Sequence, residues 1–286
     1  MARRADAHPD NVSGPFFVDR ACIDCGTCYQ FALDSFADGG DHARVHCQPG
    51  TPEARLRAAM ALVACPVSAI GTSDKAPVAE AARAFPHPLA DDLLFCGYTS
   101  GKSFGAWSYL ILRPEGNVLV DCPRAAGPLM DRIEALGGIR WMVLSHRDDV
   151  ADHQAFHDRF GCDRVMHRAD GLRGLERYVD GDEPVPLAPD LLLIPTPGHT
   201  AGSQCLLHRD RLFTGDHLWW NPAKGRLSAS RAYAWHSWPQ QLDSLERLLA
   251  YAFSWVLPGH GSPHRAASPA AMRADLARAL ADLRRS

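Results

Sequence analysis

The chain is organised around residues 144–153, Leu144-Ser145-His146-Arg147-Asp148-Asp149-Val150-Ala151-Asp152-His153. From His146 onward this stretch carries two histidines and three aspartates in eight positions. It follows the apolar run Trp141–Leu144, which is predicted to be a buried strand after the helix stop at Gly137-Gly138. The prediction places His146 at the carboxyl end of a strand, where open α/β sheets bind their ligands.

Three later apolar runs end in the same way. The run 191–194 leads to Gly198-His199, the run 211–213 to Gly215-Asp216, and the run 255–257 to Gly259-His260. Strand ends that meet at one edge of a sheet would gather one set of candidate ligands: His146, Asp152, His153, His199, Asp216 and His260. Imidazole nitrogens and carboxylate oxygens suit one or two ions of zinc or non-haem iron.

These motifs resemble the metallo-β-lactamase fold superfamily, whose pattern is H-x-H-x-D-H, then G-H-T/S, G-D and G-H in that order. The resemblance covers about Leu93 to Arg285, and His199, Asp216 and His260 match residue for residue. The first motif departs from the pattern, because Asp148 stands where the middle histidine is expected and two extra residues precede Asp152-His153. Asp148 is then a replacement ligand, with Asp149 as its competitor.

The resemblance implies an α+β fold, a four-layer αββα metallo-β-lactamase sandwich. It also implies that His146, Asp148 and His199 hold one metal ion, that Asp152, His153 and His260 hold a second, and that Asp216 bridges them. Asp152 is expected to be catalytic as well. A metal-bound water has a pKa of roughly 7, so such a site supplies a hydroxide nucleophile at neutral pH. The number of ions stays open, because the loss of the middle histidine weakens one half of the site.

A second metal-binding pattern lies near the N-terminus. Cys22, Cys25 and Cys28 follow one another at Cys-x2-Cys-x2-Cys spacing, and a remote Cys65 is followed by Pro66. This thiolate spacing is typical of bacterial iron–sulfur sites, and over roughly Gly14 to Thr72 the chain resembles the bacterial ferredoxins. Only one quartet can be assembled, so one [4Fe-4S] cluster held by Cys22, Cys25, Cys28 and Cys65 is expected.

The alternatives for these cysteines are a zinc knuckle or a set of buried thiols. Structural zinc usually takes its ligands as two pairs, whereas the tight triple spacing lets one loop wrap a cuboidal cluster. Gly26 would allow backbone N–H groups to approach the cluster sulfur. Cys47 is left over and is interpreted as a thiol on a strand rather than as a ligand.

Length and charge limit the classes of function. The 286 residues have room for one large and one small domain, and the net charge of -3 from 30 basic and 33 acidic residues gives no basic surface for nucleic acid or membrane. No window has the eighteen apolar residues of a membrane helix, and no apolar signal segment follows Met1, so a cytoplasmic protein is expected. The expected parts are a flexible arm (1–13), the ferredoxin-like [4Fe-4S] domain (14–72), a linker (73–92) and the metallo-β-lactamase-fold domain (93–286).

The aromatic segment between Asp216 and Leu242, with Trp219, Trp220 and Tyr233 among its residues, is predicted to be a loop over the site. His217 is a candidate for contacts behind the ligands.

The function predicted is a metal-dependent hydrolase of a small-molecule thioester, lactone or phosphoester, fused to a ferredoxin module that could dock a redox partner protein. The first alternative is an oxidoreductase resembling the flavodiiron proteins, with non-haem iron in the same site. It is favoured by the carboxylate Asp148 and by the appended cluster, but no flavin-binding domain is seen. The second alternative is an iron–sulfur electron carrier with a degenerate hydrolase domain.

Overall fold

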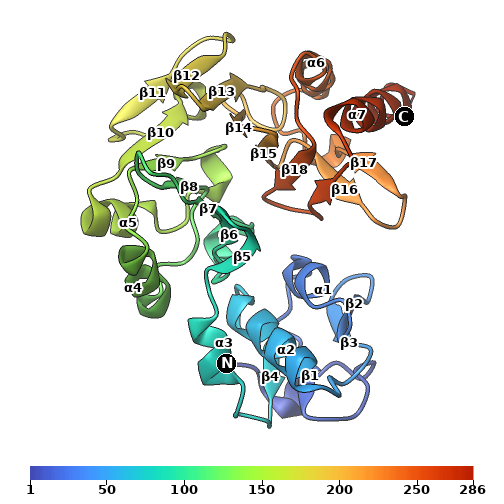
Figure 1. Ribbon diagram of the computed structural model, residues 1–286. Coiled ribbons are helices and arrows are strands. Elements are labelled where there is room, and N and C mark those ends of the chain that lie inside the picture. The colour runs from blue at the N-terminus through green and yellow to red at the C-terminus, as the bar shows by residue number, and fades with distance from the viewer. Residues whose placement is uncertain (286) are drawn as a thin grey trace. The chain divides into compact units, whose positions relative to one another are not determined.

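The computed structural model describes residues 1–285, so the predicted boundary at residue 286 lies outside the described residues. Its contacts divide the chain into two compact units. The first unit contains Met1–Arg140 and Ala151–Cys162, and the second contains Trp141–Val150 and the chain from Asp163 onward (Figure 1). The histidine and aspartate candidates are therefore distributed over both units, with Asp152 and His153 in the first and the others in the second.

The N-terminal part of the first unit is built from two small strand pairs and two helices. Strand β1 (Phe16–Val18) pairs antiparallel with β4 (Ile70–Thr72), and β2 (Phe36–Asp38) pairs with β3 (Ala43–Val45). Helix α1 (Thr27–Phe31) contains Cys28, the last cysteine of the triplet, and α2 (Pro52–Ala64) ends just before Cys65. Figure 1 shows α2 beside β1 and β4. The two helices thus present the triplet and the remote cysteine.

The residues predicted to form a flexible arm make backbone hydrogen bonds to these strands. The N–H of His8 donates to the carbonyl of Val18, and that of Val12 donates to the carbonyl of Val45. The Asn11 side chain donates to Val18 and accepts from the N–H groups of Val18 and Val45. The predicted boundary at residue 14 remains a prediction.

The rest of the first unit is a meander with helices. Helix α3 (Val78–Arg83) lies in the predicted linker and precedes β5 (His87–Ala90). The strands β5, β6 (Leu93–Phe95), β7 (Tyr109–Ile111) and β8 (Val118–Val120) pair antiparallel in chain order. Helices α4 (Gly127–Ala135) and α5 (His153–Phe160) complete the unit.

The second unit contains a parallel set of strands and a larger sheet. Strand β9 (Trp141–Val143) pairs parallel with β10 (Asp163–His167), which pairs parallel with β11 (Arg177–Val179). The six-stranded sheet has the order β12-β13-β14-β15-β18-β19. Its strands are β12 (Val185–Ala188), β13 (Leu191–Pro195), β14 (Gln204–His208), β15 (Arg211–Gly215), β18 (Trp255–Pro258) and β19 (His264–Arg265). Each strand predicted to lead into a ligand, β9, β13, β15 and β18, is formed.

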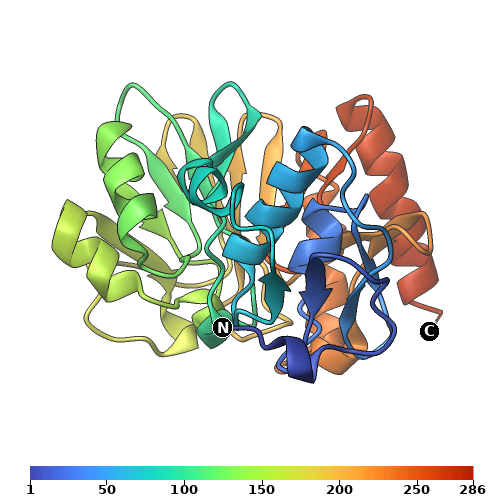
Figure 2. The same ribbon diagram turned by 90° about the horizontal axis from the view of Figure 1, so that it is seen from below.

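Two amphipathic helices cover this sheet. Ser237 caps α6 (Trp238–Leu248) and Ser268 caps α7 (Pro269–Leu283), each through its hydroxyl oxygen. Leu245 of α6 and Leu276 of α7 are buried against the sheet residues Leu212 and Val256. Figure 2 shows α7 along the outer side of the second unit. This core holds β15 and β18 side by side, and both strands end at predicted ligands.

The segment predicted to be a loop over the site is only partly a loop. It begins with a hairpin of β16 (Trp219–Asn221) and β17 (Arg226–Ser228). The prediction was wrong there because the segment shows no alternation of apolar and polar residues that would indicate strands. The hairpin is stabilised instead by packing of Leu227 into the core and of Trp220 on His264. The residues from Ser230 to Ser237 are the part that reaches the candidate site.

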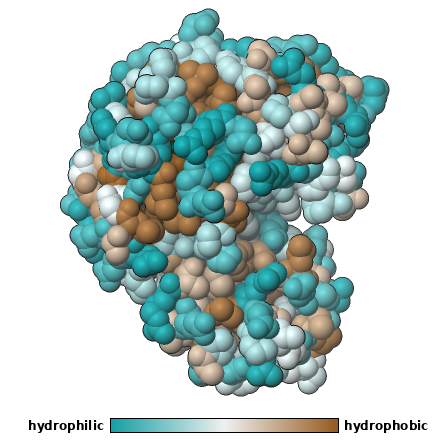
Figure 3. Space-filling model, in the orientation of Figure 1, coloured by the Kyte–Doolittle hydropathy of each residue, from teal (hydrophilic) through white to brown (hydrophobic). Residues whose placement is uncertain are grey.

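Among residues 1–285, no helix is long and apolar enough to span a bilayer. The face in Figure 3 is largely hydrophilic, with apolar residues in smaller patches between polar ones.

Candidate metal centres

Two buried imidazoles form the centre of the site in the second unit. His146 follows β9 and is 1% exposed, and His199 follows β13 and is 3% exposed. Their rings meet edge to face with centroids 4.7 Å apart. The Nε2 atoms of both rings are buried, and neither has a hydrogen-bond partner among the described residues. A buried polar atom without a partner costs free energy, so both nitrogens are positioned for a ligand.

Two carboxylates face these nitrogens. Oδ2 of Asp216 lies 3.7 Å from Nε2 of His146 and 3.8 Å from Nε2 of His199. Oδ2 of Asp148 lies 4.0 Å and 3.8 Å from the same two atoms. Ligands bound at about 2.0–2.2 Å to one tetrahedral ion lie roughly 3.4 Å apart, so a small contraction around an ion would bring these atoms into contact with it.

Asp149 lies on the other side of the His146 ring. It is 1% exposed, and its Oδ2 lies 3.9 Å from Nδ1 of His146. Its carboxylate also lies against the turn before His260, where a Cβ on Gly259 would come within 2.7 Å of Oδ2 of Asp149 and 3.0 Å of Oδ1 of Asp216. Of the two competing aspartates, Asp148 therefore faces the unpartnered Nε2 atoms, and Asp149 supports the ring from behind.

Hydrogen bonds orient the ligand side chains. Nδ1 of His199 lies 2.5 Å from the carbonyl oxygen of Tyr233 and must donate to it, which leaves the Nε2 lone pair free. Nδ1 of His146 lies 2.9 Å from Oγ of Ser145. Nδ1 of His260 lies 2.7 Å from Oδ1 of Asp216. Each hydrogen bond engages one polar atom of a candidate ligand and so sets the direction in which the other polar atom of that side chain points.

A buried aspartate that the sequence analysis did not select joins two ligand loops. Oδ2 of Asp170 accepts from the N–H of Arg147 at 2.8 Å and from Oγ1 of Thr200 at 2.9 Å, and Oδ1 accepts from the N–H of Gly202 at 2.6 Å. Arg147 follows His146, and Thr200 follows His199. Asp170 follows β10 as the other candidates follow their strands, and that strand-end pattern could have identified it.

The charges of the site suit a cation. Burial is the main cause that lowers the pKa of His146 to about 4, so its ring is neutral at pH 7. Burial opposes ionisation of Asp216, but His260 and the two other imidazoles hold the pKa of its carboxyl well below the usual range. Neutral imidazole and ionised carboxylate are the forms that bind metal ions.

His217 is the residue that follows Asp216 in the chain. It is 1% exposed, burial lowers its pKa to about 3, and neither ring nitrogen has a hydrogen-bond partner among residues 1–285. Its carbonyl accepts from Nε2 of Gln241. His217 therefore packs as a neutral ring behind the ligands.

The candidates Asp152 and His153 belong to the first unit, at the start of α5. Both carboxylate oxygens of Asp152 are engaged there. Oδ1 lies 2.6 Å from Nζ of Lys102, and Oδ2 accepts from the N–H of Ala125 at 2.9 Å. Lys102 is a second residue that the sequence analysis did not select, since nothing in its local pattern points to Asp152.

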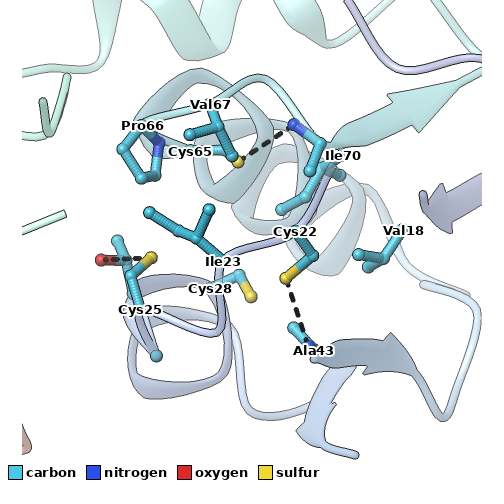
Figure 4. A pocket seen from close by; sticks show the side chains of 13 residues that line it. Val18, Cys22, Ile23, Cys25, Cys28, Ala43, Cys65, Pro66, Val67 and Ile70 are labelled. Atoms are coloured by element: carbon cyan, nitrogen blue, oxygen red, sulfur yellow. Dashed lines mark hydrogen bonds between the residues drawn. The ribbon is translucent and has the colours of Figure 1, made fainter. Parts of the chain in front are cut away.

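The four predicted cluster cysteines line one cavity in the first unit. Cys22, Cys25, Cys28 and Cys65 come together from the triplet loop, α1 and the end of α2, with Ile23 and Val67 beside them (Figure 4). Backbone N–H groups point at two of the sulfurs: Asp24 and Ala43 at Sγ of Cys22, both at 3.4 Å, and Ala69 at Sγ of Cys65 at 3.3 Å. Converging thiolates with N–H···S contacts are the environment that an iron–sulfur cluster requires.

Burial disfavours ionised thiols in this cavity. It raises the pKa of Cys25 to about 11 and that of Cys28 well above its usual value. A cluster must therefore displace protons when its cysteines bind. Cys47 is exposed and does not line the cavity, and it lies after β3 rather than on a strand as predicted, because β3 ends at Val45.

Both parts of the chain are similar to known proteins. Residues 18–72 match the family model described as the 4Fe-4S single cluster domain of Ferredoxin I. A hydroxyacylglutathione hydrolase of Rhizobium etli is 29% identical over 163 residues, which are 52% of this chain and 60% of the relative. The chain thus spans less than two thirds of the length of that relative.

Solved structures share the fold of about two thirds of this chain. The DIM-1 metallo-β-lactamase is 14% identical, with a TM-score of 0.51 over 67% of this chain and 96% of that one. A metallo-β-lactamase from Hirschia baltica is 16% identical, with a TM-score of 0.50 over 68% and 95%. The expected fold class is confirmed: the chain is an α+β protein of the metallo-β-lactamase fold. It carries, in addition, an N-terminal single-cluster [4Fe-4S] ferredoxin domain.

Proposed function

We propose that the protein is a metal-dependent hydrolase of a small-molecule thioester, with one metal ion held by His146, His199 and Asp216 and with Asp148 as a fourth donor. The observation that carries the proposal is the pair of buried, unpartnered Nε2 atoms facing Oδ2 of Asp216 at 3.7 and 3.8 Å. When bound, such an ion lowers the pKa of a water to roughly 7 and polarises the bond to be cleaved.

The chain's own residues hold and orient this site. The Tyr233 carbonyl keeps the proton of His199 on Nδ1, and His260 turns Oδ2 of Asp216 toward the imidazoles. The ring of Trp235 lies 6.3 Å from that of His199 and is 59% exposed, so it offers an apolar wall to a substrate. The thioester class is supported by the similarity to hydroxyacylglutathione hydrolase, and lactones and phosphoesters are the other substrates to test.

The test is hydrolysis by the anaerobically purified full chain loaded with zinc. Thioesters, including S-hydroxyacylglutathione, should be cleaved, and His199→Ala should lose both the zinc and the activity. His236→Ala is the control, because that histidine lies on the same segment as Trp235 but supplies no ligand. Zinc-loaded protein that cleaves no thioester, lactone or phosphoester would contradict the proposal.

A second candidate function is an oxidoreductase with non-haem iron in the same site. It is favoured by the donor set itself, because two imidazoles and one carboxylate with open positions are the ligands of many non-haem iron oxygenases. The ferredoxin domain would supply or receive electrons. Oxygen consumption by the iron-loaded chain supplied with an external electron donor, abolished by His146→Ala, would support this candidate, whereas zinc-dependent hydrolysis without oxygen consumption would favour the hydrolase.

A further inference from the structure

The carboxylate oxygens that a second metal ion would bind already accept hydrogen bonds within the protein. Nδ1 of His260 donates to Oδ1 of Asp216, so only Oδ2 of that residue faces the two imidazoles. In the first unit, the oxygens of Asp152 accept from Nζ of Lys102 and from the N–H of Ala125. The second half of the site implied by the sequence pattern therefore does not fit an ion as the first half does.

We infer that the ammonium group of Lys102 replaces a second metal ion at Asp152, so that this protein takes a single ion at His146, His199 and Asp216. The inference rests on the proposed function, because it concerns the number of ions at the same site. An ammonium group is a compact point charge with three donors, and it neutralises a carboxylate as a cation would.

Charge and composition support this role. Nζ of Lys102 lies 2.6 Å from Oδ1 of Asp152, so the ammonium and the carboxylate form an ion pair. Lys102 is one of only three lysines in a chain whose other basic side chains are arginines, the other two being Lys75 and Lys224.

The loop that carries Lys102 is fixed by the cluster-binding segment of the same unit. On one side of Lys102, Oγ1 of Thr99 donates to the carbonyl of Ala64, the residue before Cys65, at 2.6 Å. On the other side, the carbonyl of Gly105 accepts from Oγ1 of Thr27 at 2.9 Å. Both hydrogen bonds are buried. These two hydrogen bonds therefore fix the backbone of the loop that presents Lys102.

The test is the zinc stoichiometry of the full chain, purified anaerobically with its cluster and measured by native mass spectrometry during a Zn²⁺ titration. All proteins should carry His42→Ala, because His8, Asp10 and His42 could themselves hold an ion. Besides the cluster, the parent should take one zinc, Lys102→Met should take two, and Lys102→Arg should take one. Lys75→Met, which changes an exposed lysine of the same unit, is the matched control and should take one zinc.

The double variant Lys102→Met/Asp152→Asn identifies where the second zinc binds. The double variant should bind one zinc, because Asp152→Asn removes the carboxylate that Lys102→Met leaves without its ammonium partner. Two zinc ions in the parent, one in Lys102→Met, or two in the double variant would each overturn the inference. If the parent and Lys102→Met each bind one zinc and the parent hydrolyses its substrate fully, the inference is overturned and the proposed function still stands. If the parent binds no zinc, both are overturned.

Discussion

Nδ1 of His260 lies 2.7 Å from Oδ1 of Asp216, and this hydrogen bond decides which oxygen of the aspartate faces the site. The other oxygen, Oδ2, lies within 3.8 Å of the Nε2 atoms of His146 and His199. Because β15 and β18 are paired neighbours, the two residues that follow them meet at the same sheet edge. His260 thus acts on Asp216 whether or not it also contacts a metal ion.

Removing this hydrogen bond should weaken metal binding. His260→Ala leaves Asp216 free to rotate, and the loss of such an orienting contact typically costs about 10–100-fold in metal affinity. Zinc affinity is measured by competition with a chromophoric chelator. His264→Ala is the matched control, because His264 pairs with Asp275 at 3.2 Å in the same unit but faces no ligand. Equal zinc affinity in His260→Ala and the parent would contradict this role.

Asp170 should act on the ligand loops in the same indirect way. Asp170→Ala removes the acceptor that joins the loops after His146 and His199 and leaves two backbone N–H groups without it. We expect a loss of about 10–100-fold in zinc affinity and about 1–3 kcal/mol in the free energy of unfolding.

The matching control for Asp170 is Asp180→Ala, which removes an exposed aspartate that pairs with Arg168. It should change neither quantity by much. A drop in stability with unchanged zinc affinity in Asp170→Ala would show that Asp170 is structural only.

Substitutions can distinguish the roles of Asp148 and Asp149 in metal binding. Asp148→Ala should lower zinc affinity, because Oδ2 of Asp148 faces both Nε2 atoms, and Asp148→His should restore it by supplying the imidazole of the family pattern. Asp149→Asn should retain zinc affinity within a few fold, since that carboxylate faces Nδ1 of His146. The reverse order of effects in the zinc titration would identify Asp149 as the ligand.

Gly105 should be required for the cluster. Its φ is +87°, and a Cβ would lie 2.7 Å from Cβ and 2.8 Å from Sγ of Cys25. Gly105→Ala should therefore cost about 1–3 kcal/mol of stability and lower the iron and acid-labile sulfide per chain. Gly127→Ala is the control, because a Cβ at that position meets nothing within 4 Å. A full complement of four iron and four sulfide in Gly105→Ala would show that the loop can move away from Cys25.

One ion pair away from both sites predicts a pH dependence. The hydrogen bonds from the buried Arg164 lower the pKa of Glu176 to about 2. A carboxyl with a lowered pKa contributes stability above its unfolded pKa and loses it as the pH falls toward the folded value. Glu176→Gln should thus cost about 1–3 kcal/mol at pH 7, and the difference from the parent should shrink between about pH 4.5 and pH 2. Urea unfolding at several pH values measures it, and a pH-independent difference would contradict the assignment.

The sequence by itself determined the fold class and the chemical character of both sites. Apolar runs that end at His146, His199, Asp216 and His260 predicted strands, and β9, β13, β15 and β18 are formed there. The cysteine spacing predicted one cavity lined by four thiols, and the structure has it. Such features are readable because periodicity, turn residues and ligand spacing are local properties of a chain.

Only the tertiary structure decided which atoms face one another. It brought Asp170, which lies in the turn after β10, between two ligand loops, and it turned Asp148 rather than Asp149 toward the Nε2 atoms. It also paired Asp152 with Lys102, fifty positions earlier in the chain. Contacts of this kind depend on packing between distant segments and on side-chain direction, and neither leaves a periodic trace in the sequence.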